Sequence, residues 1–133
     1  FPIHFFITFL TISIANAQQY NFQTTQLSVL QKNKNREWGK WSKPTDTKII
    51  IKLDLTKNKI IIYSSQIQHY SILEYLQKEV TEVDVINSYL CRSLDGIPVK
   101  ISFMVRKDQN DKAQVYVYNK DFVFCYDIIE LVK

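Results

Sequence analysis

Hydrophobic and polar residues alternate along several stretches of the chain with a period of two, which is typical of β-strands. The clearest stretch spans residues 99–105, where one face is apolar and the intervening side chains are mostly polar. The apolar face consists of Val99, Ile101, Phe103 and Val105. Residues 47–55 alternate in the same way, and after a polar turn residues 60–63 form a β-branched run. These two stretches predict a hairpin.

Turn signals separate the strand-like stretches in the second half of the chain. Asp95–Gly96 is a favoured hairpin dipeptide, because glycine tolerates a positive φ. Polar residues 107–112 and 119–121 separate the next runs, which are centred on Val115–Tyr118 and Phe122–Tyr126. Three hairpin signals in about fifty residues predict an antiparallel meander.

Two segments are harder to interpret. Residues 67–80 fit either a strand or an amphipathic helix with one apolar stripe. We favour a strand that ends at about Tyr75. Residues 32–47 contain lysine, asparagine, tryptophan and proline without any period, which predicts an extended loop.

The last run is apolar on both faces. Val123 and Cys125 lie on one face, whereas Phe122, Phe124 and Tyr126 lie on the other. A single sheet cannot bury both faces, so either it curls into a barrel or a second layer covers it. Closure would also remove open strand edges. The expected fold is all-β: an antiparallel meander forming a barrel or half-barrel of about eight strands, lipocalin-like in shape.

Composition supports one folded domain. The 133 residues are 46% hydrophobic and 14% aromatic, which argues against a disordered chain. Seventeen Lys and Arg residues against thirteen Asp and Glu give a net charge of +4. Proteins dedicated to nucleic-acid binding usually carry a stronger, clustered positive charge, so we expect no nucleic-acid partner.

The N-terminal segment has the pattern of an export signal. Residues 1–17 contain no Asp, Glu, Lys or Arg, and their apolar run ends in Ala15–Asn16–Ala17. That tripeptide fits the small-x-small preference of signal peptidases, and the run is too short for a stable membrane anchor. We expect cleavage between Ala17 and Gln18, a single β domain over residues 18–133, and a periplasmic or extracellular location.

The order of short motifs resembles that of small exported proteins of unknown function from Bacteroides-type bacteria. The motifs are Glu37–Ser42, Ile49–Asp54, Lys59–Ser64, Gln68–Ile72, Cys91, Asp95–Gly96 and the stretch from Val117–Tyr118 to Tyr126–Ile128. This resemblance implies a compact secreted β domain and supplies no catalytic residues. Gly39–Lys40–Trp41 is similar to the Gly-x-Trp tripeptide of lipocalins. Because only the tripeptide matches, we favour a barrel of similar shape over common ancestry.

Cys91 and Cys125 are the only cysteines. In an oxidising compartment, two cysteines on predicted strands suggest a disulfide across the sheet, with two buried thiols as the alternative. Two cysteines with His69 as the one histidine after residue 17 do not supply the four ligands of a typical zinc site, so no metal is expected.

Catalytic patterns are weak. The chain has neither a Gly-x-Ser-x-Gly turn nor a phosphate-binding glycine loop, and we expect no cofactor. A small hydrolase built on paired carboxylates or on a Cys–His pair is an alternative. Its candidate residues are Asp54, Glu74, Asp127, His69, Cys91 and Cys125. Their spacing does not predict that they meet, so an enzyme is not expected.

The remaining hypothesis is binding. Residues 32–43 interleave basic and aromatic side chains, a combination that can bind anionic or stacking ligands. The candidate binding residues are Arg36, Trp38, Lys40, Trp41, Tyr116 and Tyr118. Alternatively, the two tryptophans close a barrel end or cover its apolar face. We expect a secreted, non-enzymatic domain whose partner is an apolar small molecule, a glycan or a protein; a structural or assembly module is the other alternative.

Overall fold

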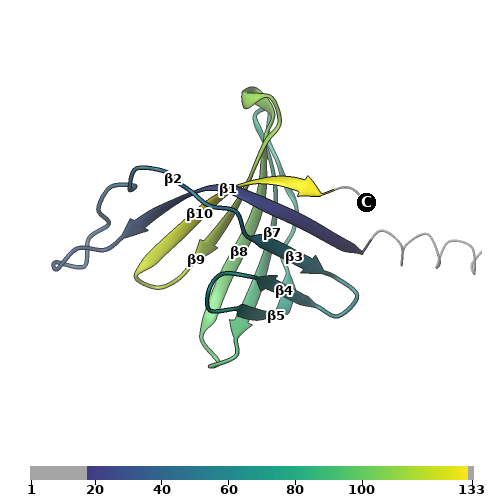
Figure 1. Ribbon diagram of the computed structural model, residues 1–133, viewed down its shortest axis with the longest axis horizontal. Coiled ribbons are helices and arrows are strands. Elements are labelled where there is room, and N and C mark those ends of the chain that lie inside the picture. Colours follow the sequence, from purple (N-terminus) through teal and green to yellow (C-terminus); the bar gives the residue numbers. More distant parts are fainter. Residues whose placement is uncertain (1–17, 132–133) are drawn as a thin grey trace, which may run out of the picture.

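A computed structural model describes residues 18–131, which form ten strands and one short 3₁₀ helix (Figure 1). In chain order the elements are β1 (Gln19–Gln31), β2 (Thr45–Asp46), β3 (Ile50–Asp54), β4 (Lys59–Ile62), β5 (Gln68–Tyr75), β6 (Glu79–Val80), β7 (Asp84–Ser93), β8 (Pro98–Arg106), η1 (Lys107–Gln109), β9 (Lys112–Tyr118) and β10 (Phe122–Leu131).

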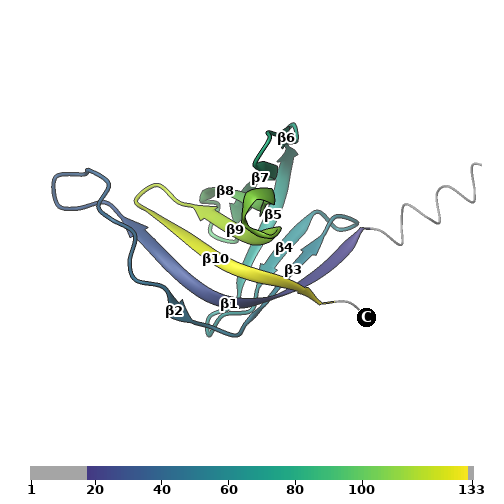
Figure 2. The ribbon, with the colours of Figure 1, turned by 90° about the horizontal axis from the view of Figure 1, so that it is seen from above.

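The strands form one closed antiparallel barrel. Neighbours follow the order β10-β9-β8-β7-β5-β4-β3-β1, and β1 pairs with β10 to close the ring. Figure 2 shows these two long strands lying side by side. The barrel has eight strands, with β2 added beside β1 and β6 beside β7. This architecture confirms the fold predicted from the alternating pattern and the hairpin signals.

The barrel is filled in the middle by branched aliphatic side chains. Alternate residues of each strand point inward, as the pleat requires. Those with no exposed surface are Ile51, Ile60, Ile62, Ile101, Val115 and Val117. Tyr70 and Tyr126 join the same core. In the described part of the chain, the middle of the barrel is therefore filled by side chains rather than forming a hollow channel.

Two β-bulges adjust which residues face inward. In β1 the register with β10 shifts between Thr24 and Gln26, so that Leu27 rather than Gln26 joins the inner face. In β5 the register with β7 shifts between Ile72 and Glu74, which leaves Leu73 as the extra residue. A one-residue shift moves every following side chain to the opposite face. Both bulges therefore keep apolar side chains on the core side.

Most predicted elements are confirmed. In the ambiguous segment, residues 67–80, strand β5 forms and ends at Tyr75, as predicted. The Asp95–Gly96 turn joins β7 to β8, and Gly96 has a φ of 82°. Residues 32–47 form an extended loop apart from the short strand β2 and an isolated bridge between Lys32 and Trp38. The sequence pattern did not reveal the long strand β1, which runs through a stretch rich in Gln and Thr, nor the two-residue strands β2 and β6.

The predicted disulfide is wrong. Both cysteines are buried free thiols. Cys91 belongs to the barrel core, whereas Cys125 alternates with the inward Tyr126 and so lies on the outer face of β10. Strands β8 and β9 also separate β7 from β10. Two thiols on opposite faces of the barrel wall cannot meet within the short Cβ–Cβ distance that a disulfide needs.

The predicted signal peptide, residues 1–17, and its cleavage site at Ala17 lie outside the described residues; Gln18 is the first residue described. Across residues 18–131, there is no helix of the length and apolarity needed to cross a bilayer.

Candidate ligand-binding site

A pocket of about 390 Å³ opens at the end of the barrel where β1 begins and β10 finishes. We call this pocket the cup. Its lining comes from six strands and the β3–β4 turn: Tyr20, Phe22, Leu53, Leu55, Asn87, Tyr89, Phe103, Met104, Val105, Ala113, Gln114, Ile128 and Glu130. The cup combines a mostly apolar wall with a few polar groups, which is the usual composition of a small-molecule site.

Four aromatic rings form a continuous wall of the cup. The rings of Tyr20 and Phe22 are stacked with centroids 6.5 Å apart, and Phe22 lies 5.5 Å from Phe103 at a tilt of 41°. Phe103 in turn meets Tyr89 edge to face at 6.0 Å. Because the rings meet at different angles, the wall can offer both ring faces and ring edges to a ligand.

Tyr75 supports the aromatic wall of the cup. Tyr75 packs edge to face against Tyr89, and its hydroxyl donates a hydrogen bond to the side-chain oxygen of Asn58 in the β3–β4 turn. Burial raises the pKa of Tyr89, with nearby Tyr75 and Tyr20 adding to the effect. Tyr89 is therefore a neutral phenol at physiological pH, and it contributes apolar surface and a hydroxyl rather than a charge.

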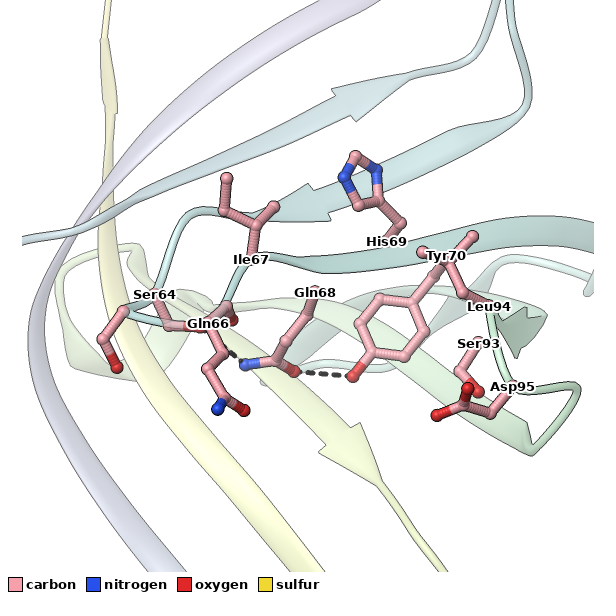
Figure 3. A pocket seen from close by; sticks show the side chains of 10 residues that line it. Ser64, Gln66, Ile67, Gln68, His69, Tyr70, Ser93, Leu94 and Asp95 are labelled. Carbon is pink, nitrogen blue, oxygen red and sulfur yellow. Dashed lines mark hydrogen bonds between the residues drawn. The ribbon is translucent and has the colours of Figure 1, made fainter.

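A second pocket, of about 590 Å³, lies at the opposite barrel end between the β4–β5 loop and the β7–β8 turn. We call it the polar pocket. In Figure 3 the Gln68 amide lies between the hydroxyls of Ser64 and Tyr70. Tyr70 donates to Gln68 Oε1 at 2.6 Å, and Gln68 Nε2 donates to Ser64 Oγ at 3.0 Å. The side-chain polar groups of Ser64, Gln68 and Tyr70 thus satisfy one another.

The structure brings together three of the six predicted binding residues. Trp41 meets Tyr116 edge to face at 6.1 Å, and Tyr116 stacks on Tyr118 at 5.9 Å. We call these three residues the outer aromatic strip, because they lie outside the barrel. Tyr116 pairs with Cys125 on β10, and Cys125 pairs with Ser28 on β1, so two small side chains lie between Tyr116 and the loop that carries Trp41.

The other three predicted binding residues lie elsewhere on the β1–β2 loop. Arg36 pairs with Asp121 at 2.8 Å, and Lys32 lies 5.1 Å from the ring of Trp38. Lys40 is exposed. The loop projects from the barrel (Figure 2), and the two tryptophans are each nearly half exposed. Neither tryptophan closes a barrel end.

The candidate catalytic residues do not converge. His69 projects from the opposite side of β5 to Gln68 and Tyr70 (Figure 3). Asp54 is buried and accepts the Lys57 backbone N–H, whereas Asp127 lies on the outer face with Lys112 and Gln114. Nowhere in residues 18–131 do three or more His, Cys, Asp or Glu side chains gather in a group that could hold a metal ion.

Comparison with protein-family models, with curated proteins and with solved structures gave no match for this chain. The site must therefore be judged from its own geometry. Sequence reasoning missed the cup, although it placed Phe103 on the inner face of a strand. Tyr20 and Phe22 belong to the strand that the pattern did not reveal, and their alternation with polar Asn21 and Gln23 was the available signal.

Proposed function

We propose that the protein binds a small, flat, largely apolar molecule in the cup. The observation that carries the proposal is the continuous wall of Tyr20, Phe22, Phe103 and Tyr89 around a space of about 390 Å³. This volume falls near the lower end of the range of about 300–1,000 Å³ typical of small-molecule sites. Aromatic side chains left partly uncovered at a barrel mouth gain most from a ligand that removes them from water.

The outer aromatic strip supports a binding role less well. Trp41 packs edge to face on Tyr116, and the Tyr116 hydroxyl accepts a hydrogen bond from Arg106 and lies 3.3 Å from Gln114 Oε1. Beneath this layer Cys125 is 8% exposed. These contacts suit a cover for the second apolar face of β10.

Binding can be tested with N-phenyl-1-naphthylamine, a neutral probe whose fluorescence rises when it leaves water. The wild-type protein should give a saturable increase. Ala113→Phe places a ring inside the cup, because Ala113 lines it and pairs with Val105 and Ile128. The filled cup should weaken binding at least about tenfold, which corresponds to about 1.4 kcal/mol.

The matched control is Ser71→Phe, which adds the same ring at an exposed position of β5. Its probe affinity should equal that of the wild type. Because Ala113→Phe can disturb the core, Tyr20→Ala provides a second test by removing one ring from the rim, and circular dichroism confirms that each variant is folded. Unchanged affinity in a folded Ala113→Phe variant would overturn the proposal.

We further propose that the protein acts outside the cytoplasm, as the apolar run and the Ala15–Asn16–Ala17 site suggest. Intact mass of the protein recovered from the culture medium or periplasm tests this proposal directly. The expected mass is that of a chain beginning at Gln18. Recovery of a chain that still carries residues 1–17 would contradict it.

A further inference from the structure

Among the described residues that line the cup, Glu130 is the one that carries a carboxylate. Glu130 lies on β10 directly opposite Phe22 of β1. Tyr126 and Ile128 of the same strand belong to the core, so alternation places Glu130 on the inner face, and it lines the cup at its rim. Glu130 is exposed, so its carboxylate stands at the open mouth of the cup beside the aromatic wall.

No described cation balances this charge. The ion pairs among residues 18–131 join Arg36 to Asp121 and Lys112 to Asp127, and neither includes Glu130. The cup lining of the described chain contains no Lys or Arg. The neighbouring Arg106 is turned to the outer face, where its guanidinium donates to Gln114 Oε1 and the Tyr116 hydroxyl, both at 3.1 Å.

The aromatic wall, like the Glu130 carboxylate, favours a ligand with a positive charge. The faces of Phe and Tyr rings carry the negative part of the ring quadrupole and attract ammonium groups within about 6 Å of the centroid. Phe22 is both a ring of this wall and the cross-strand neighbour of Glu130. Asn87, opposite Phe103 on β7, adds a neutral hydrogen-bonding group.

We propose that the ligand of the cup is an amphipathic amine, with a flat apolar body against the four rings and a protonated or quaternary nitrogen beside Glu130 and Phe22. This inference rests on the proposed function and specifies its ligand class. The flat apolar body would pack against the four rings, and the ammonium group would lie beside the Glu130 carboxylate, which has no Lys or Arg with it among the described lining residues.

Three ligands with the same naphthalene body test the charge preference by isothermal titration calorimetry at pH 7. They are 1-naphthylmethylamine, which is protonated, the neutral 1-naphthylmethanol, and the anionic 1-naphthoate. The amine should bind roughly 3- to 30-fold more tightly than the alcohol, as expected for a cation near exposed rings and a rim carboxylate. The naphthoate should bind most weakly.

Substitution of Glu130 tests whether its carboxylate causes the preference for the amine. Glu130→Gln should lower the amine-to-alcohol affinity ratio to about one. The control is Glu74→Gln. Glu74 is exposed on the outer side of β5, where it lies opposite Leu90 of β7, so this variant should keep the wild-type affinity ratio.

The outcomes separate the two proposals. Equal binding of amine and alcohol, with both weakened by Ala113→Phe, would overturn the amine inference and leave the cup as a neutral apolar site. A preference that persists in Glu130→Gln would also overturn it. Binding of all three ligands that is unaffected by Ala113→Phe would overturn the proposed function itself.

Discussion

Tyr75 and Tyr89 meet edge to face with ring centroids 5.4 Å apart, and the bulge in β5 makes the contact possible. Ile72 pairs with the inward Cys91, so uninterrupted alternation would direct Glu74 inward and Tyr75 outward. The extra residue Leu73 reverses this order and sets Tyr75 opposite Tyr89. A single inserted residue therefore supports the aromatic wall of the cup and keeps a carboxylate out of it.

The hydroxyl of Tyr75 links β5 to the β3–β4 turn, and its removal should cost stability. In Tyr75→Phe the hydrogen bond to Asn58 is lost, with an expected loss of about 0.5–1 kcal/mol in the free energy of unfolding. Urea denaturation measures the change. Tyr63→Phe is the control, since this exposed hydroxyl has no hydrogen-bond partner among residues 18–131. Equal stability of Tyr75→Phe and wild type would contradict the prediction.

Ser88 and Ser102 form a buried hydroxyl pair, with their Oγ atoms 2.7 Å apart across β7 and β8. Removing one hydroxyl leaves the other without this partner, so Ser88→Ala should cost about 1–3 kcal/mol. The double variant should cost less than the sum of the two single variants, with a coupling of about 1 kcal/mol in a double-mutant cycle. Additive effects would show that the pair does not interact, and exposed Ser71→Ala should be neutral.

The cysteines should behave as two inert thiols. Burial raises the pKa of Cys91 to about 12, and burial also raises that of Cys125. At pH 8 the native protein should therefore react slowly with Ellman's reagent, because only the thiolate attacks. After denaturation without reductant, two thiols per chain should react. Finding none would indicate a disulfide and contradict the structure.

Alkaline pH should destabilise the protein through Cys91. Above pH 9 the thiol ionises in the unfolded chain but stays protonated in the folded one, up to a pKa of about 12. The unfolded state then binds fewer protons, so the free energy of unfolding falls by up to about 1.4 kcal/mol per pH unit over this window. Urea denaturation at several pH values should show a shallower fall for Cys91→Ala. Identical slopes would contradict this assignment.

The turn at Gly96 tests the backbone requirement of the β7–β8 hairpin. Gly96 has φ 82°, and a Cβ at this position would meet no atom within 4 Å. Any loss of stability in Gly96→Ala must therefore come from the backbone conformation, and we expect about 1–2 kcal/mol. Gly96→Asn should lose less, because asparagine tolerates a left-handed backbone. Equal stability of glycine and alanine at this position would contradict the prediction.

The candidate site was predictable only in part. The density of basic and aromatic residues drew attention to the β1–β2 loop, but there Arg36 pairs with Asp121 and Trp38 packs with Lys32. The cup needs Tyr20 and Phe103, which are far apart in the chain and lie on strands that are not direct neighbours in the sheet. The strand that carries Tyr20 was hidden, because the bulge after Thr24 shifts its alternation by one residue.

Alternation and turn chemistry act over a few residues, so the sequence by itself predicted the hairpin over residues 47–63, the Asp95–Gly96 turn, the apolar face of β8 and the runs that became β9 and β10. Ring closure between β1 and β10, the faces of Cys91 and Cys125, and the meeting of Glu130 with Phe22 were decided only by the tertiary structure. These relationships depend on long-range register, which no local pattern encodes. Pairing across the closed barrel sets that register, and the two bulges adjust it.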